Sequence, residues 1–517
     1  MKKQFISLFL ITCSALFGSC STAKETSKES HSQCVDEMFH ISFYDDDKVT
    51  LLYSEDLPRG QMPVYRGETP KKKTTVEYTY QFEGWEPRLY QVTKDQNYYA
   101  RYKKIMNEQT ELEIVRLSPG IYDVTFEVSS NGNPFYVDLL VNGTVANTFQ
   151  SEDSTFTIEN LAPNTEYSLV ARNGSHSSKP RRFVTGDYRF QPINYVHPED
   201  NCYEESGHFL GSPCLIEFKN LLFAMMDVFR SGGTGKGHIL SMLYVSRNGG
   251  KDWNFVRYFK PTQWGTMFIY NDQLYFLATD LVNKGIGLFV SDDGFNWSDQ
   301  YHIIDGEFAT SPTSVIVKDD KVYLAPREHD AEGNSICHIL IGDCKKSLLE
   351  KESWTVTNGY MPPFSLGGDQ TIHYAEEGNV VEYNGEIFAL YRFAYKKALM
   401  LKLEGTELQF YKVIDMECGW CKFVIRKEGN VYYAMGNDTC YPRNYIKLYK
   451  STDVEHWEVV KVIEDIRNIE DIEHNGIQYP YFIIKNNRLY TLLRIALNGA
   501  DTFHNSNVIG FKNLPLD

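Results

Sequence analysis

The last two-thirds of the sequence repeats one apolar strand six times, and this repeat limits what the chain can fold into. Each copy follows a turn signal such as Asn384-Gly385 and then runs through aromatic and aliphatic residues. The copies are Leu222–Asp227, Leu274–Asp280, Val322–Arg327, Ile387–Arg392, Val431–Gly436 and Leu489–Arg494. A repeat of about 45–57 residues, with room for four short strands in each unit, is typical of a β-propeller. The sequence therefore predicts an all-β fold with a six-bladed β-propeller over residues 187–517.

Composition supports β structure and excludes one class of partner. Aromatic residues make up 14% of the chain, and they favour half-buried strands. The net charge is −16, whereas a nucleic-acid binder needs an excess of Lys and Arg to replace phosphate counterions. We therefore expect no nucleic-acid partner. No nucleotide or flavin fingerprint occurs, so we expect no organic cofactor and no metal in the site, while a structural calcium ion stays compatible with the sequence.

The first 20 residues have the pattern of an export signal. Two lysines precede an apolar run from Phe5 to Phe17, and a small-residue cleavage site ends at Cys20. This ending resembles the signal of bacterial lipoproteins, which implies lipidation of Cys20 and a polar tether over 21–37. An ordinary signal peptide cut nearby is the alternative. The resemblance implies a place in the bacterial cell envelope, on the periplasmic or surface face of the outer membrane, held there by the lipid anchor alone.

The remaining cysteines are expected to be buried or disulfide-bonded. Of the ten cysteines, Cys13 lies in the signal and Cys20 is the lipidation site. The others pair outside the cytosol in ways that the sequence does not specify. Cys418 and Cys421 form a C-x-x-C pair, but without a second pair or a histidine cluster this is weak evidence for metal.

Two small β modules precede the repeats. Over residues 38–105, a Phe82-Glu83-Gly84-Trp85 turn and a final aromatic strand resemble the β-grasp-like repeats of bacterial surface proteins. Over residues 108–186, the segment Leu161–Tyr167 resembles the L-x-P-x-T-x-Y corner of fibronectin type III domains. That resemblance implies that the Tyr167 hydroxyl is tied back to the backbone. We expect both modules to act as spacers.

Three loops within the repeats share a second motif. They are Ser246–Trp253, Ser291–Trp297 and Ser451–Trp457, and they resemble the Asp box of sialidase-like propellers. In this motif an Asx side chain caps a tight turn, Gly supplies a positive φ, and Trp packs beneath the turn. The first loop has Asn in place of Asp, and the third lacks the Gly. The motif supports the fold and carries no chemistry of its own.

The residues that end the repeated strand suggest an anion site. Equivalent positions hold Asp227, Thr279, Arg327, Arg392, Gly436 and Arg494. A charge at the end of an apolar strand is costly unless it is paired, and convergent guanidinium groups suit a carboxylate, sulfate or phosphate. The alternative is that each arginine forms a salt bridge with a neighbouring Asp or Glu.

The Asp boxes and the repeat together resemble the sialidase superfamily over residues 187–517. Sialidases hold the carboxylate of the sugar with three arginines, use a Tyr nucleophile activated by a Glu, and protonate with an Asp. However, Ser212 stands where the R-I-P signature of the first blade would place an arginine. The blade architecture therefore carries over, whereas the catalytic set and the specificity for sialic acid do not.

Local chemistry supplies the remaining candidates. The catalytic candidates are Asp227, Glu377, Tyr479, His208 and His329, and the substrate-binding candidates are Arg327, Arg392, Arg494, Asp280 and His474. These residues lie at expected strand ends or loops, and the pair Glu376-Glu377 can raise the pKa of one of its carboxyl groups.

These observations predict a glycoside hydrolase that removes an acidic terminal sugar from a glycan. One alternative is a uronate-specific polysaccharide lyase, in which a His or Tyr removes the C5 proton. Another is a glycan-binding protein without catalytic activity.

Overall fold

The computed structural model describes residues 37–75, 78–106, 112–129, 135–174, 176–186, 189–196, 209–229, 239–367, 374–497 and 500–516. The expected export signal, its Cys20 and all but the last residue of the tether lie outside these ranges. Within them, strands dominate, and the helical elements are two short 3-10 turns, Lys351–Ser353 and Phe364–Leu366. The predicted all-β class is confirmed. The described part of the chain holds no helix long and apolar enough to cross a membrane.

The chain divides into two compact units, which are described separately. One consists of Met1–Lys73 and Tyr80–Ile105, and the other of Thr74–Thr79 and Met106–Asp517. In the first unit, β1 (Met38–Tyr44), β2 (Leu51–Pro58), β3 (Tyr78–Glu86) and β4 (Gln96–Met106) form a sheet in the order β2-β1-β4-β3. Strand β1 pairs in parallel with β4 and antiparallel with β2. Phe43 and Tyr98 are fully buried, and Trp85 packs edge-on against Phe43 with ring centroids 4.7 Å apart.

The second unit begins with two antiparallel sheets. One contains β5 (Glu113–Pro119), β6 (Asp123–Ser129) and β9 (Thr155–Glu159). The other contains β7 (Phe135–Val141), β8 (Thr144–Ser151), β10 (Glu166–Asn173), β11 (His176–Ser177) and β12 (Arg181–Val184). Phe126 from the first sheet and Val137 and Leu169 from the second are buried in one core, because alternate residues of each strand point inward. The hydroxyl of Tyr167 accepts a hydrogen bond of 2.9 Å from the backbone N–H of Ala162, as expected for a tyrosine corner.

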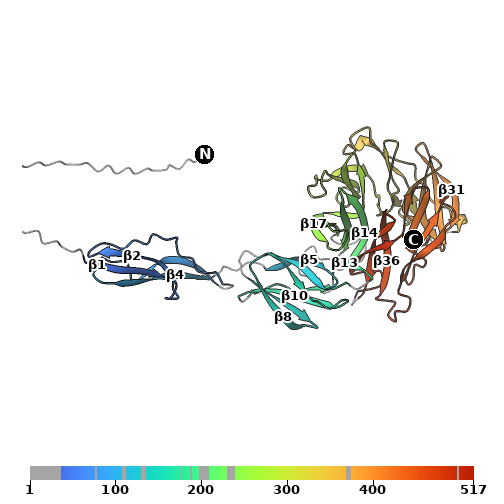
Figure 1. Cartoon of the computed structure of the whole chain (residues 1–517). Helices are drawn as coiled ribbons and strands as arrows, with labels where there is room; N and C mark the ends of the chain where they lie inside the picture. Colours follow the sequence, from blue (N-terminus) through green and yellow to red (C-terminus); the bar gives the residue numbers. More distant parts are fainter. Residues whose placement is uncertain are drawn as a thin grey trace, which may run out of the picture. The chain divides into compact units, whose positions relative to one another are not determined.

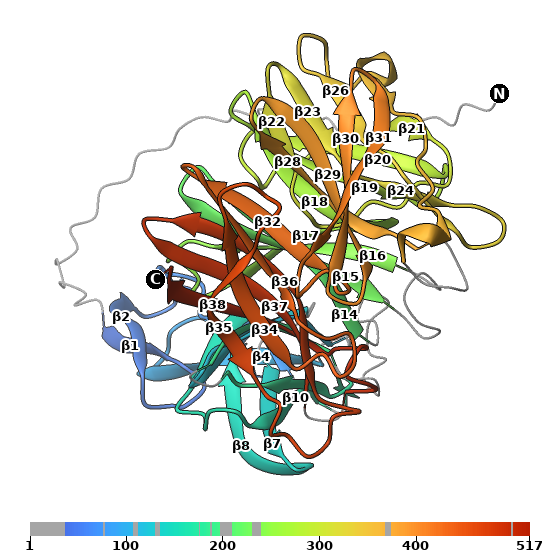
Figure 2. The same cartoon turned by 90° about the vertical axis from the view of Figure 1, so that its right-hand side faces the viewer.

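The described residues after this point form six four-stranded antiparallel sheets (Figures 1 and 2). The first two are β14–β17 (Phe209–Phe218, Leu221–Phe229, Ile239–Ser246, Asn254–Phe259) and β18–β21 (Thr262–Tyr270, Gln273–Asp280, Gly285–Ser291, Tyr301–Asp305). The third is β22, β23, β26 and β27 (Ile316–Lys318, Lys321–Leu324, Leu340–Asp343, Trp354–Val356), and it is interrupted by the hairpin β24–β25 (Arg327–His329, Ser335–Cys337).

The last three sheets follow the same order along the chain. They are β28–β31 (Glu376–Tyr383, Glu386–Ala394, Lys397–Glu404, Glu407–Asp415), β32–β35 (Phe423–Glu428, Val431–Asn437, Tyr445–Ser451, Glu458–Asp465), and β36–β38 (Gly476–Lys485, Arg488–Ala496, Val508–Pro515) joined by β13 (Gln191–Tyr195). Strand β13 pairs with β38, so the start and the end of this region share one sheet. The second strand of each sheet contains or begins one copy of the repeated apolar segment.

The first strands of the sheets lie next to one another. Strand β14 contacts both β18 and β36, β28 contacts β22 and β32, and β32 contacts β36. The second strands are almost wholly buried behind them, with β15, β19, β29 and β37 supplying most of their residues to the core. Side chains at the same end of the first strands are thereby brought together.

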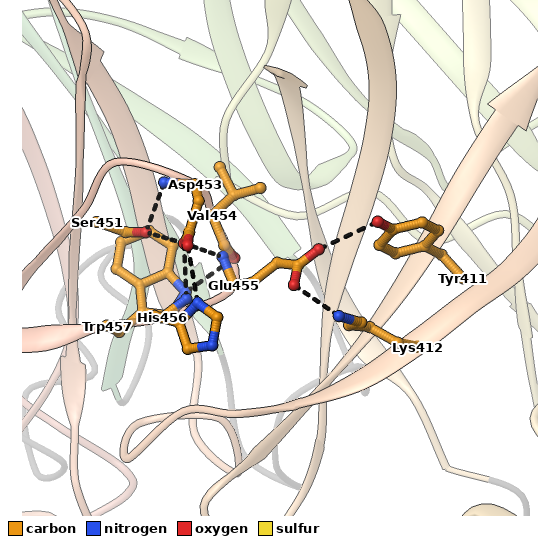
Figure 3. A network of polar contacts seen from close by, with 8 residues as sticks. All are labelled: Tyr411, Lys412, Ser451, Asp453, Val454, Glu455, His456 and Trp457. Atoms are coloured by element: carbon orange, nitrogen blue, oxygen red, sulfur yellow. Dashed lines mark hydrogen bonds and ion pairs between the residues drawn. The ribbon is translucent and has the colours of Figure 1, made fainter. Parts of the chain in front are cut away.

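The three Ser…Trp loops each follow the third strand of a sheet. In the loop after β34, Asp453 accepts hydrogen bonds from the backbone N–H groups of Glu455 and His456, and the indole of Trp457 donates to the carbonyl of Val454 (Figure 3). Val454 has a φ of 59°, where the loop after β20 has Gly294 with a φ of 80°. The carboxylate of Glu455 lies 2.6 Å from Nζ of Lys412 on β31, so this loop ties the fifth sheet to the fourth.

Candidate active site

Four of the first strands carry the same irregularity near their N-terminal ends. In β14, β18, β28 and β36 one extra residue enters the strand, so the register with the second strand shifts by one. The residues at this bulge are Ser212, Trp264, Glu377 and Tyr479, with φ values of 49°, 52°, 51° and 47°. Left-handed backbone at a non-glycine residue costs about 1–3 kcal/mol and clusters at functional sites. A bulge also re-aims the side chain that it carries.

The predicted equivalent positions lie directly opposite these bulges. Asp227, Thr279, Arg392 and Arg494 each pair with the residue that precedes the bulge of their own sheet. Each bulge side chain therefore has a candidate binding residue on the adjacent strand. Because the first strands contact one another, several of these pairs meet in one place.

Three arginines gather around Tyr479. Arg494 lies on β37, Arg392 on β29, and Arg443 in the loop between β33 and β34. The guanidinium groups of Arg494 and Arg443 each lie 5.1 Å from the centroid of the Tyr479 ring. Arg443 Nη1 also donates a hydrogen bond of 2.9 Å to Oε1 of Gln478, the residue before the Tyr479 bulge. Tyr479 is thus a phenol held between a buried cation, Arg494, and a half-buried one, Arg443.

Glu377 supplies a carboxylate to this cluster. Its Oε2 lies 3.0 Å from Nε of Arg392, but the pair is not aligned as a hydrogen bond, so both atoms lack a hydrogen-bond partner among the described residues. Burial alone would lower the pKa of Arg392, because it disfavours the charged form. The electrostatic effects of Glu377 and of the Tyr374 phenol together outweigh burial, so the pKa of Arg392 is raised well above its ordinary value. Arg392 therefore stays cationic.

Arg494 is the least compensated cation of the cluster. Its side chain is 1% exposed, and its Nε and Nη2 have no hydrogen-bond acceptor among the described residues. Burial, reinforced by the charge of Arg443, lowers the pKa of Arg494 to about 10, although Tyr479 and Asp227 oppose this. A Cβ at Gly211 would lie 3.4 Å from Cζ of Arg494, so the guanidinium of Arg494 lies beside the first sheet, next to Ser212.

Arg327 belongs to a second, neutralised group. Its Nε lies 2.7 Å from Oε2 of Glu376, and Nε2 of His329 lies 2.9 Å from Oε1 of the same carboxylate. Burial would raise the pKa of Glu376, but His329 and Arg327 lower it below its usual range. The guanidinium of Arg327 also lies 5.8 Å from the ring of Trp264. The salt-bridge alternative therefore holds for Arg327, and also for Arg392 with Glu377.

Asp227 lies beside the arginine cluster with a perturbed carboxyl group. It is 1% exposed, and it accepts hydrogen bonds from the hydroxyl of Ser241 at 2.8 Å and from the backbone N–H of Trp264 at 2.9 Å. Burial raises the pKa of Asp227 to about 7, against the lowering effect of these donors and of Arg494. A carboxyl group with this pKa exchanges protons near neutral pH and suits general acid–base work.

The other candidates lie in different surroundings. His208 lies outside the described residues. Asp280 accepts hydrogen bonds from the backbone of Val282 and Asn283 in the turn after β19, and it lies 3.0 Å from Nδ1 of His302. His474 is half exposed and lies 3.0 Å from Asp471 in the same turn. The described contacts of His474 are those of a local turn, and those of Asp280 are its own turn and His302 on β21.

Three residues of the site were not predicted from the sequence. Arg443 lies in the loop after Gly436, the one repeated strand that ends without a polar side chain, and that gap was the available signal. Tyr374 lies before β28, with its ring centroid 5.3 Å from the guanidinium of Arg392. Lys422 is 1% exposed, donates a hydrogen bond of 2.8 Å to the carbonyl of Pro480, and has a pKa lowered to about 7, chiefly by burial.

No group of three or more His, Cys, Asp and Glu residues within the described ranges is arranged to hold a metal ion.

No protein-family model and no curated protein matches the sequence. Among solved structures, the chain is similar to a Hadza microbial sialidase, with a TM-score of 0.47 and 12% identity over 77% of this chain and 93% of that one. A Trypanosoma rangeli sialidase in complex with 2,3-difluorosialic acid gives 0.45 and 12% identity over 62% of this chain, and the match spans only 56% of that enzyme. An α-L-arabinofuranosidase from Lactobacillus brevis gives 0.35 and 9% identity, over 49% and 90%. What the site does is therefore argued from its own residues.

Proposed function

We propose that residues 187–517 form a six-bladed, sialidase-like β-propeller that hydrolyses the bond to an acidic terminal sugar. The arginine cluster carries this proposal. Arg392 and Arg494 bring two buried positive charges and Arg443 a half-buried one, against the carboxylate of Glu377 and an Asp227 whose pKa is raised to about 7. The cluster is therefore short of negative charge, and a bound anion completes it.

A sugar carboxylate is the anion that we assign to the cluster. Among the described residues, Nε and Nη2 of Arg494 and Nε of Arg443 are buried donors of the cluster without a hydrogen-bond acceptor, while Nε of Arg392 faces Glu377 at 3.0 Å. Guanidinium groups bind carboxylates through paired N–H···O bonds, and these bonds are strongest where water is excluded. The sequence resembles sialidases in its blade architecture, and sialidases hold the sugar carboxylate with three arginines. The arginine that Ser212 replaces is substituted in this proposal by Arg494, whose guanidinium lies beside that residue.

Tyr479 is the nucleophile in the proposed reaction. The guanidinium groups of Arg443 and Arg494 lie beside its ring, and Glu377 interacts electrostatically with Arg494. The phenol oxygen attacks the anomeric carbon while its proton passes to Glu377, and Asp227 protonates the leaving oxygen. Water then cleaves the glycosyl–tyrosine bond, restores the proton of Asp227, and the phenol recovers its proton from Glu377. The product keeps its anomeric configuration.

The N-terminal part of the chain is proposed to deliver this enzyme to the cell envelope. We assign residues 1–20 to a lipoprotein signal, Cys20 to the lipid, and 38–105 and 108–186 to β-grasp-like and fibronectin type III-like spacers. The basic, apolar and small-residue order of the signal supports export, and the Tyr167 hydrogen bond supports the second module.

The experiment is a digest of sialylated, uronate-capped and rhamnose-capped glycans with the full mature chain. We expect released reducing sugar, without the ultraviolet absorbance of a new C4–C5 double bond. Tyr479→Phe is expected to lower kcat by at least about 10³-fold, because it removes the attacking oxygen. Tyr301→Phe is the matched control, since this tyrosine is 39% exposed and lies on β21, the fourth strand of its sheet.

The same digest separates the alternatives. A phenol between two guanidinium groups also suits removal of the C5 proton from a uronate whose carboxylate is neutralised. Absorbance of the double bond would therefore replace the hydrolase with a lyase. Glycan affinity without product on prolonged incubation would leave a binding protein.

A further inference from the structure

Two cysteines meet beside the arginine cluster. Cys421 directly precedes Lys422 and β32, and Cys440 lies in the loop between β33 and β34. Their Sγ atoms are 2.8 Å apart, which is within about 1 Å of the length of a disulfide bond. Arg392 and Arg443 also interact electrostatically with both thiols. The pair therefore belongs to the surroundings of the candidate site.

The loop that carries Cys440 also carries Arg443. It spans the residues between the end of β33 at Asn437 and the start of β34 at Tyr445. The Cys440 thiol donates a hydrogen bond of 2.8 Å to the carbonyl of Trp420, on the segment that contains Cys421. Arg443, three residues later, reaches Gln478 from the opposite end of the loop. The position of Arg443 thus depends on where this loop is fastened.

We propose that Cys421 and Cys440 are joined by a disulfide that fastens the loop and positions Arg443 in the anion site. The role of Arg443 rests on the proposed function, whereas the covalent link rests on the geometry of the two thiols. The link closes a loop of the chain that contains all of β32 and β33. It therefore connects the segment before β32 to the loop after β33.

The reaction that forms this link needs a disulfide donor, such as oxidised glutathione or a dithiol oxidase of the cell envelope. The Cys440 thiolate attacks one donor sulfur and releases the first donor thiol. Cys421 then attacks the Cys440 sulfur and releases the second. Two protein thiols are oxidised, the donor disulfide is reduced to two thiols, and the two cysteine protons pass to them. The hydrogen bond from Cys421, together with the nearby Arg443, lowers the pKa of Cys440 to about 7 although burial opposes this, so Cys440 is the attacking thiolate.

The link is tested first by peptide mapping of the full chain, purified from an oxidising compartment and alkylated without reduction. Trypsin is expected to give residues 413–422 linked to residues 428–443. Because the first peptide contains both Cys418 and Cys421, fragment ions must place the bond on Cys421. Recovery of alkylated Cys421 and Cys440 on separate peptides, or a bond to Cys418, would overturn the proposal.

The role of the link is tested on the loop itself, without any ligand. Arg443 is followed by Asn444, so trypsin can cut there once the loop opens. We expect native cleavage after Arg443 to accelerate by at least about tenfold after treatment with a phosphine reductant, and equally in Cys440→Ser, but not in Cys344→Ala. Cys344 is a buried thiol of a different sheet and serves as the matched control. Equal cleavage before and after reduction would overturn the positioning role.

Binding separates this inference from the proposed function. Titration with N-acetylneuraminate and with glucuronate is expected to show weaker binding after reduction, by at least about tenfold. The same reduction should change nothing further in Arg443→Ala. If neither sugar binds the oxidised chain, the proposed function fails, while the mapping and the cleavage rates still decide whether the link exists and fastens the loop. Undiminished binding after reduction would refute the positioning of Arg443.

Discussion

Replacing Arg494 with methionine should make the protein more stable while it removes anion binding. Arg494 is buried, and two of its donors have no acceptor within the described residues. Its pKa falls from the ordinary 12.5 to about 10, and each pKa unit corresponds to about 1.4 kcal/mol. The charged form is therefore disfavoured in the folded protein by about 3 kcal/mol. Methionine removes the charge and keeps most of the apolar contact, so after the loss of contact with Tyr479 we expect a net gain of about 1–2 kcal/mol.

Arg392→Met is the matched comparison, because this arginine has a carboxylate partner. Its removal leaves Glu377, only 12% exposed, without its nearest counter-ion, and this should cost about 3 kcal/mol. Thermal unfolding of the full chain should therefore move in opposite directions for the two variants, upward by about 1–3 °C for Arg494→Met.

The ligand arm completes the assay. Saturating N-acetylneuraminate or glucuronate, whichever the wild type binds, should raise its unfolding temperature and leave that of Arg494→Met unchanged. The reasoning is refuted if both substitutions destabilise the protein alike, since Arg494 would then be a satisfied structural residue.

Three further substitutions test the described contacts. Gly294→Ala should destabilise the protein by about 2–4 kcal/mol in urea unfolding, because its new Cβ would lie 2.3 Å from the Phe223 ring at a φ of 80°; a loss under about 1 kcal/mol would contradict this. Burial and the nearby arginines lower the pKa of His504 to about 3. The unfolded chain therefore takes up a proton below pH 6.5 that the folded chain refuses, and stability falls by about 1.4 kcal/mol per pH unit down to about pH 3. His504→Gln should flatten urea-unfolding free energies over this window, and an unchanged pH dependence would argue against a neutral, buried ring. Tyr167→Phe should cost about 1–2 kcal/mol, because it leaves a backbone N–H without its acceptor; calorimetry of residues 108–186 within the chain measures this, and an unaltered transition would refute it.

The sequence was informative where a pattern recurred and weak where it did not. The repeated apolar segment located the second strand of each sheet. It also showed that Asp227, Arg392 and Arg494 occupy equivalent positions at the ends of these segments. The sequence did not show which arginines have a carboxylate partner, because this depends on which carboxylate the neighbouring sheet brings near. Arg327 meets Glu376 of the next sheet and is neutralised, whereas Nε and Nη2 of Arg494 meet no acceptor within the described part of the chain.

The sequence signalled the loop contribution only through the missing polar side chain at Gly436. Arg443 occupies no repeated position, and its place follows from how the loop after β33 folds back toward Gln478. The bulges were invisible for a related reason, since one extra residue in a strand does not disturb the apolar pattern of its neighbour. Their equivalence appears only in the register of the paired strands.

The recurrence of the bulge has a consequence for how such a chain can change its chemistry over generations. Each bulge residue is an extra residue outside the hydrogen-bonded ladder of its strand, so strand pairing does not depend on its side chain. These residues are Ser212, Trp264, Glu377 and Tyr479. The four bulge positions can therefore carry different side chains, and in this chain they carry a hydroxyl, an indole, a carboxylate and a phenol. New specificities can therefore arise through single substitutions at these four equivalent positions, while the sheets that hold them stay unchanged.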